Sequence, residues 1–351
     1  NNDAIAIENG WIAIANRGMF VNNDLIEMQT MSRSSIFNNG DFTNNAEIFI
    51  DDVDEELFPG LRNLKTFTNS STGEIFMSDL NCTGLSNFGS PNGSATFNND
   101  GRIEIENTGS FYAINNSVLE TWNNNGTLKV TGTSKGIANS SEFYLNNDTL
   151  IVPQFTNFDF GKLFIGDNQE KELVITGDMD NRGTIVCSAS SPTVHDTLSI
   201  LGNLECEGTA ELRFNFVPSL GLDVEIIKAN SISGYFETLT KIPFWNDISL
   251  DYSRFPSIYA VINDCGNAKK VNAFIPNSGS WNDPSNWSLG HLPLPCETVS
   301  IVGNGTTKSV SLYSDPTIRS LELDNAVLNI FSSSDFIIDG NFFRSGGQGL
   351  K

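Results

Sequence analysis

Apolar and polar residues alternate along much of this chain, and each alternating run follows an Asn-rich corner. The pattern is clear in FNNGDF at 37–42, FNNDGRIEI at 97–105 and WNNNGTLKV at 122–130. Further copies begin at Val21, Phe42, Phe67 and Leu145, and a weaker one lies at 180–186. The leading apolar residues of neighbouring copies are roughly 21 to 30 residues apart, a spacing typical of the repeats of solenoid proteins.

The alternating runs predict β-strands with one face turned inward, because successive side chains on a strand point to opposite faces. Asn, Asp and Gly tolerate a positive φ at low cost and so suit the corners between strands. Asn side chains at successive corners are expected to stack and to hydrogen-bond to the next coil. A single coil cannot bury its inner face, whereas a stack of coils can. The sequence therefore predicts an all-β fold, a right-handed parallel β-solenoid.

An antiparallel β-sandwich is the alternative for the first 265 residues, since it also has short strands separated by turns. Two features favour the solenoid. The corner residues recur in one orientation relative to the strands, and the mixed loop lengths of a Greek key are missing. No sustained apolar stripe with helical spacing is present, so long helices are not expected.

Changes in the pattern predict three segments. Residues 1–265 form a β-solenoid block with a closing cap from about residue 221, residues 266–271 form a linker, and residues 272–351 start a second block. The cap begins with an Ile-Ile-x-Ala strand and a Ser-Gly-x-Phe turn within 221–236, and residues 250–262 supply its last strand or pair. A cap is expected because an open end exposes unpaired strand edges.

Two stretches resemble known families. Residues 221–236 resemble the closing element of passenger-type β-solenoids. The sequence GSWNDPSNWSLGHLPLP at 279–295, followed by ETVSI at 297–301, resembles the W-x-D-P-x-N-W opening motif of large secreted Bacteroidota-type surface adhesins built of tandem β-solenoid blocks. The resemblance implies that Trp281 and Trp287 cover the open end of the new block. Glu297 stands where the family usually has Asp, and no consequence is expected.

Composition narrows the function classes. The formal net charge is -22, which repels phosphate backbones and makes nucleic acid an unsuitable partner. No apolar run approaches the roughly 20 residues of a membrane-spanning helix, so no membrane insertion is expected in this segment. Both ends look cut from a longer protein, and a secretion signal is expected outside the segment.

Candidate chemistry is sparse, and no catalytic residue, cofactor site or metal site is assigned. His195 and His291 lack the neighbours of a Ser/His/Asp array. The acidic stretches at 51–56 and 178–183 supply oxygen ligands of the kind that Ca²⁺ prefers, but no known calcium-loop spacing, so a solvated acidic loop is the simpler interpretation. Acids and bases do not recur at one position of the repeat, as a β-helical lyase would require.

The five cysteines leave two disulfides open. Cys187 and Cys206 are 19 residues apart (206 − 187), near one coil, and either form a disulfide or are buried thiols. Cys265 and Cys296 flank the junction between blocks, and a bond there would stiffen it. Cys82 would be left over.

These observations predict a structural or adhesive segment of a long extracellular cell-surface protein or appendage, and not an enzyme. The expected partners are copies of the chain itself, or glycans or proteins on the surface of another cell. The alternative is a carbohydrate-binding or carbohydrate-cleaving parallel β-helix. A groove lined by aromatic rings and paired carboxylates would favour that alternative.

Overall fold

The computed structural model describes most of the chain and places it in two compact units. The described residues are 3–54, 58–89, 93–109, 111–133, 135–147, 149–166, 171–216, 223–242, 248–261, 271–294, 297–303, 305–313, 316–331, 336–338 and 341–345. Unit 1 comprises Asn1–Val186 and Asp196–Glu205, and unit 2 comprises Cys187–His195 and Cys206–Lys351. Strands account for 62% of the structure, which is a parallel β-solenoid of about 12 turns.

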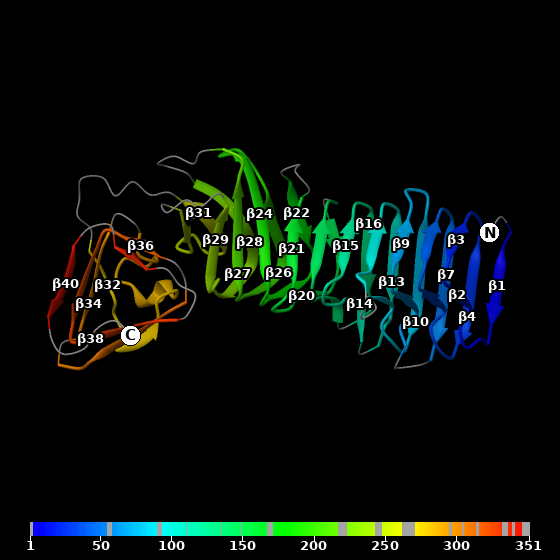
Figure 1. The fold of residues 1–351 in the computed structure, drawn as a ribbon, viewed down its shortest axis with the longest axis horizontal. Coiled ribbons are helices and arrows are strands. Elements are labelled where there is room, and N and C mark those ends of the chain that lie inside the picture. Colours follow the sequence, from blue (N-terminus) through cyan, green and yellow to red (C-terminus); the bar gives the residue numbers. More distant parts are fainter. Residues whose placement is uncertain are drawn as a thin grey trace. The chain divides into compact units, whose positions relative to one another are not determined.

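Each coil of unit 1 contributes one strand to each of three parallel faces, as the stacked arrows in Figure 1 show. Face 1 consists of β1 (Ile5–Glu8), β4 (Ile26–Met31), β7 (Glu47–Val53), β10 (Glu74–Leu80), β13 (Arg102–Glu106), β16 (Thr127–Thr131), β19 (Thr149–Ile151), β22 (Glu172–Ile175) and the start of β26 (Thr197–Cys206). Face 2 consists of β2 (Ile14–Asn16), β5 (Ile36–Asn38), β8 (Leu61–Asn63), β11 (Leu85–Asn87), β14 (Tyr112–Asn116), β17 (Lys135–Asn139), β20 (Gln154–Asn157) and β23 (Asp178–Asn181). Face 3 consists of β3 (Met19–Asn22), β6 (Asp41–Asn44), β9 (Thr66–Asn69), β12 (Thr96–Asn99), β15 (Thr121–Asn124), β18 (Glu142–Leu145), β21 (Lys162–Ile165) and β24 (Thr184–Ser191).

Every pairing within these faces is parallel, so the predicted solenoid is confirmed and the antiparallel sandwich is wrong for unit 1. The register is held by apolar residues while the coil length varies. Ile26 pairs with Ile48 after 22 residues (48 − 26), and Ile48 pairs with Ile75 after 27 (75 − 48). The extra residues are accommodated between strands, because a one-residue slip would turn a whole inner rank outward.

An inward column of stacked rings runs along face 3. Neighbouring ring centroids are 4.3 to 5.5 Å apart, close to the spacing of paired strands. The column consists of Phe20, Phe42, Phe67, Phe97, Trp122 and Phe143. Beyond the area it buries, each such pair contributes about 0.5–1.5 kcal/mol. The apolar residues that lead the copies at 42, 67, 97 and 122 are therefore core residues.

Two other copies of the repeat had been aligned one face out of place. Phe37 directly precedes Asn38 at the end of face 2 and points outward, half-buried, while Val21 directly precedes Asn22 on face 3. In the core copies the ring lies two residues before the Asn. Because strand side chains alternate, this one-residue difference decides which face a residue occupies.

Antiparallel pairing occurs in unit 2, where the closing cap is predicted. β28 (Asp223–Gly234) and β30 (Ser249–Asp251) both pair antiparallel with β31 (Ser257–Val261), whereas β27 (Thr209–Phe214) pairs parallel with β29 (Thr238–Ile242). Gly234, in the predicted Ser-Gly-x-Phe turn, has a φ of 75°. A Cβ atom there would lie 2.3 Å from the carbonyl oxygen of Cys206, so this turn requires glycine.

The later part of unit 2 again forms parallel ladders. One contains β32 (Val271–Ala273), β34 (Thr298–Val302), β37 (Ser320–Asp324) and β40 (Phe342–Ser345). The others join β33 (Ser278–Ser280), β35 (Lys308–Leu312) and β38 (Ala326–Ile330), and β36 (Thr317–Ile318) with β39 (Ile337–Ile338). A single 3-10 turn, η1 (Pro284–Asn286), interrupts the first coil. The predicted second block is thus β-solenoidal in its described part.

The predicted boundaries at residues 265 and 271 stay predictions, because residues 262–270 lie outside the described part of the chain. The two compact units divide near residue 205. In the part of the chain that the structure describes, no helix is long and apolar enough to span a membrane.

Candidate functional site

Two columns of buried asparagines run along unit 1 at the ends of faces 2 and 3. In the long ladder, each side-chain Nδ2 donates to the Oδ1 of the next coil at 2.8 to 3.0 Å. Its members are Asn16, Asn38, Asn63, Asn87, Asn116, Asn139, Asn157 and Asn181. The predicted stacking of corner asparagines is therefore confirmed.

The short ladder has the same geometry over fewer coils, with Nδ2 to Oδ1 distances of 2.7 to 2.9 Å. Its members are Asn22, Asn44, Asn69, Asn99 and Asn124. In the next coils, Leu145 and Ile165 occupy the same register position. The amide column is there replaced by an aliphatic one, so the short ladder ends while the long ladder continues.

Each ladder asparagine also holds its own corner. Asn139 donates through Nδ2 to the carbonyl oxygen of Ser141 at 2.8 Å and accepts at Oδ1 from the Ser141 backbone N–H at 3.3 Å. Asn63 makes the equivalent pair with Lys65 at 2.9 and 3.4 Å. The side chain thus mimics a backbone turn while joining two coils, and chains of hydrogen bonds of this kind reinforce one another.

A shallow polar groove of about 350 Å³ lies on the surface of unit 1, where face 3 strands turn into face 1 strands. Its lining includes Glu74, Asp100, Arg102, Asn125 and Asn147, and no aromatic ring. Arg102 lies 3.7 Å from the Glu74 carboxylate, and Asn125 donates to Asp100 at 2.7 Å. The groove can therefore offer charged and amide hydrogen-bonding groups to a hydroxyl-rich ligand.

Sequence reasoning missed this groove, although a signal for it exists. Each coil begins its face 1 strand with a corner glycine followed by a polar residue, as in Gly73-Glu74, Gly101-Arg102 and Gly126-Thr127. A Cβ atom on Gly126 would lie 2.0 Å from the carbonyl oxygen of Gly101, so the glycines permit the close stacking of corners.

The predicted calcium candidates make contacts with protein groups. Asp51 accepts from the Ser78 hydroxyl at 2.6 Å, and Asp178 accepts from the backbone N–H of Asn203 at 2.7 Å. Among the described residues, no three His, Cys, Asp or Glu side chains are grouped to hold a metal. Glu55 and Glu56 lie outside those residues, so calcium binding by 51–56 stays a prediction.

The two histidines lie in different settings. His195 is in β25 (Val194–His195), a short strand paired antiparallel with β24, rather than in the loop that the sequence predicted. His291 has Nδ1 at 2.8 Å from the carbonyl oxygen of Leu292 and Nε2 at 3.5 Å from a Glu297 carboxylate oxygen.

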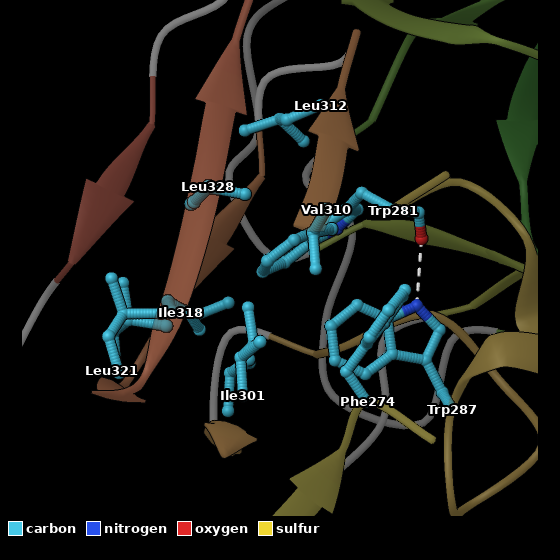
Figure 2. Packing of buried hydrophobic residues seen from close by; sticks show 12 residues of the cluster. Phe274, Trp281, Trp287, Ile301, Val310, Leu312, Ile318, Leu321 and Leu328 are labelled. Atoms are coloured by element: carbon cyan, nitrogen blue, oxygen red, sulfur yellow. Dashed lines mark hydrogen bonds between the residues drawn. The ribbon is translucent and has the colours of Figure 1, made fainter. Parts of the chain in front are cut away.

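Trp281 and Trp287 of the opening motif are buried in the apolar core of the second block, as Figure 2 shows. The Trp287 indole N–H donates to the carbonyl oxygen of Trp281 at 2.7 Å, and the two rings meet edge to face at 4.8 Å. Phe274 packs against Trp287 at 5.2 Å. The motif thus begins the core of the block.

Glu297 is more consequential than the sequence suggested. Its side chain is fully buried, and one carboxylate oxygen accepts from the Leu294 backbone N–H at 3.1 Å and the Asn272 amide at 3.2 Å. It therefore ties the loop that follows His291 to β32. A buried carboxylate persists only when such donors compensate its lost hydration.

The three described cysteines, Cys82, Cys187 and Cys206, are buried thiols rather than half-cystines. The predicted Cys187–Cys206 disulfide is therefore wrong. Its premise was one coil of about 19 residues, whereas Ile175 and Ile200 of successive coils are 25 residues apart (200 − 175). Burial raises the pKa of Cys82 to about 12 and also raises that of Cys206. Cys265 and Cys296 lie outside the described residues.

No family model, no curated protein and no solved structure matches the chain. The likeness to Bacteroidota-type adhesins consequently rests on the residues of the opening motif and the closing element alone. The described architecture is that of a repeat β-solenoid protein of about 12 turns.

Proposed function

We propose that this chain is a rigid structural segment of a long extracellular cell-surface protein, which acts through stiffness and attachment rather than through catalysis. The long asparagine ladder carries the proposal. It joins eight successive coils through buried amides, from Asn16 to Asn181. Separating two coils would strand these amides away from water, at about 1–3 kcal/mol for each group left unpaired.

The composition and the motifs support the same role. An acidic chain with net charge -22 stays soluble at high local concentration, and its opening motif resembles that of tandem surface adhesins. A repeated block would lengthen such a protein without changing its local chemistry. The partners we infer are copies of the chain, or glycans or proteins of another cell surface.

Immunogold labelling of intact, unpermeabilised cells that produce this chain tests the proposal. With an antibody raised against the purified chain, gold is expected on the cell surface or along extended appendages, and pre-immune serum should give none. Label that appears only after permeabilisation would contradict the proposal.

The polar groove favours a second candidate, a carbohydrate-binding or carbohydrate-cleaving β-helix. Glu74, Asp100 and Arg102 offer carboxylates and a cation there, but the lining lacks the aromatic rings on which sugars stack. Incubating the purified chain with a panel of polysaccharides and measuring new reducing ends tests cleavage. Release that Glu74→Gln/Asp100→Asn abolishes would favour this candidate over the structural role.

A further inference from the structure

Faces 1 and 2 of unit 1 differ in charge in a way that the linear sequence hides. Over seven successive coils, from β2 to β20, the strands of face 2 contain no Asp or Glu. Over five coils of face 1, from β1 to β13, the strands carry nine acids and one base, Arg102. The acids are Glu8, Glu27, Glu47, Asp51, Asp52, Glu74, Asp79, Glu104 and Glu106.

The cations of face 2 lie on aromatic rings. The Arg33 guanidinium lies 4.2 Å from the Trp11 ring and 4.4 Å from Phe58. One turn of the repeat further on, Arg62 lies 5.8 Å from Phe37 and 5.3 Å from Phe88.

The pattern extends to later coils, where Lys135 lies 5.4 Å from the Tyr112 ring. None of Arg33, Arg62 and Lys135 forms an ion pair with a carboxylate within the described ranges. Stacking fixes these side chains at little further entropic cost and leaves their charge available to a ligand.

Several of the rings are also open to solvent. Trp11 is 67% exposed and Phe88 is 44% exposed. Aromatic residues and arginines are the residue types most enriched at protein interfaces, and acids are depleted there. Face 2 therefore has the composition of an interface on a protein whose surface is otherwise acidic.

We propose that face 2 of one copy binds face 1 of a second copy, side by side. This inference rests on the proposed structural role, to which it adds the partner and the contacting surfaces. Charge complementarity selects the occupant, because the acidic surface that face 2 requires lies on the same coils of the same chain. Both faces repeat at the strand spacing of about 4.8 Å, so acids and cations can meet over several coils.

The contact joins two different surfaces and is therefore heterologous. Each copy keeps one face 1 and one face 2 free at the ends of a row, so rows can grow by addition. A lateral row of rods would give an extended surface structure the stiffness that a single rod lacks.

Charge reversal on face 2 tests the contact. Sedimentation velocity of the full chain at about 20 mM NaCl should show concentration-dependent association that weakens toward about 0.5 M NaCl. Arg33→Glu/Arg62→Glu should lower the association constant at least tenfold. The matched control Lys162→Glu/Arg319→Glu changes the net charge equally but lies outside faces 1 and 2, and should change it less than threefold. Circular dichroism verifies that each variant is folded.

A mixing experiment sharpens the test. Glu8→Lys/Glu27→Lys makes face 1 cationic and should also abolish association, because both faces then carry the same sign. An equimolar mixture of this variant with Arg33→Glu/Arg62→Glu should associate again, since each supplies the face that the other lacks.

Four outcomes would overturn the inference: a wild-type chain that stays monomeric at low salt, a control that weakens association as much as the face 2 variant, a mixture that stays monomeric, and a monomer that instead binds heparin through face 2. Surface label together with a monomeric chain would refute only this inference. Label confined to permeabilised cells, with association intact, would refute only the structural role.

Discussion

At the scale of single residues, a ladder asparagine and a surface asparagine are chemically identical and differ only in their surroundings. Asn63 is fully buried and bonded to two neighbouring coils, whereas Asn98 points outward on face 3 with contacts to Thr68 and Asn123. A hydrogen bond lost at the surface is replaced by water, but one lost in the interior leaves a polar group stranded. The energetic role of an asparagine is therefore set by its position in the coil.

Asn63→Ala tests this difference directly. The change removes the acceptor of Asn38 and the donor to Asn87, and should lower the free energy of unfolding by about 1–3 kcal/mol for each group left unpaired. The matched control Asn98→Ala should cost less than about 0.5 kcal/mol. Urea unfolding followed by circular dichroism measures both, and equal losses would contradict a structural role for the ladder.

The buried thiols supply a second residue-scale prediction. A raised pKa lowers the thiolate fraction at pH 8, and burial blocks access, so Cys82 and Cys206 should resist iodoacetamide in the native protein. Both should react fully in about 8 M urea, which removes the burial. Peptide mass spectrometry reads the labelling. Fast native modification of Cys82, or a peptide pair linking Cys187 to Cys206, would refute the assignment.

At the scale of elements, the strands are short and gain stability from the coils on either side. The aromatic column illustrates this, since Phe97 contacts Phe67 at 4.8 Å and Trp122 at 4.3 Å, while its own strand has only four residues. Isolated strands of this length are not stable in water, so the coil exists only as part of a stack.

Phe97→Ala should therefore destabilise strongly, by about 3–5 kcal/mol, because it opens a cavity in the column and removes two stacking contacts. Phe160→Ala provides the control, since the Phe160 side chain is 76% exposed, and it should have little effect. Thermal unfolding monitored by circular dichroism measures the difference. A similar midpoint for the two variants would mean that the column does not hold the coils together.

Corner glycines set how closely neighbouring coils approach. Gly126→Ala would place a Cβ atom against the backbone of Gly101, which cannot move without separating the coils, and should cost about 1–3 kcal/mol. Gly18→Ala is the matched control, because a Cβ atom at Gly18 meets nothing within 4 Å. Its effect should be near zero or slightly stabilising, through the unfolded state. Comparable urea midpoints for the two variants would argue against close corner packing.

At the scale of the whole molecule, charge acts on stability and on association in opposite directions. The acids of face 1 repel one another within a copy, so salt should stabilise the fold by screening them. The proposed contact between faces 1 and 2 is attractive, and the same screening should weaken it.

Raising NaCl from about 20 mM to about 0.5 M should therefore raise the thermal midpoint of the dilute chain while it lowers the sedimentation coefficient of the concentrated one. Differential scanning fluorimetry and sedimentation velocity measure the two effects. A thermal midpoint that falls with added salt would show that attraction, not repulsion, dominates within the copy.

Much of the fold followed from the sequence because the signals are local. The Asn-Asn-Gly and Asn-Asn-Asp corners, the period-two alternation around Ile103 and Leu128, and the missing helical stripe all follow from φ/ψ preferences and from the geometry of a strand. The opening motif likewise indicated where apolar side chains gather again, around Trp281 and Trp287.

What only the tertiary structure decided depends on register between coils of unequal length. Lengths of 22 and 27 residues hide that Asn38 meets Asn63, that Phe37 points outward, and that Cys187 and Cys206 are not neighbours in one column. The polar groove and the acid-free face 2 arise in the same way, from residues some 20 to 30 positions apart that stack at about 4.8 Å. Local chemistry therefore determined the strands and corners, and the stacking of inward ranks alone determined which residues share a surface.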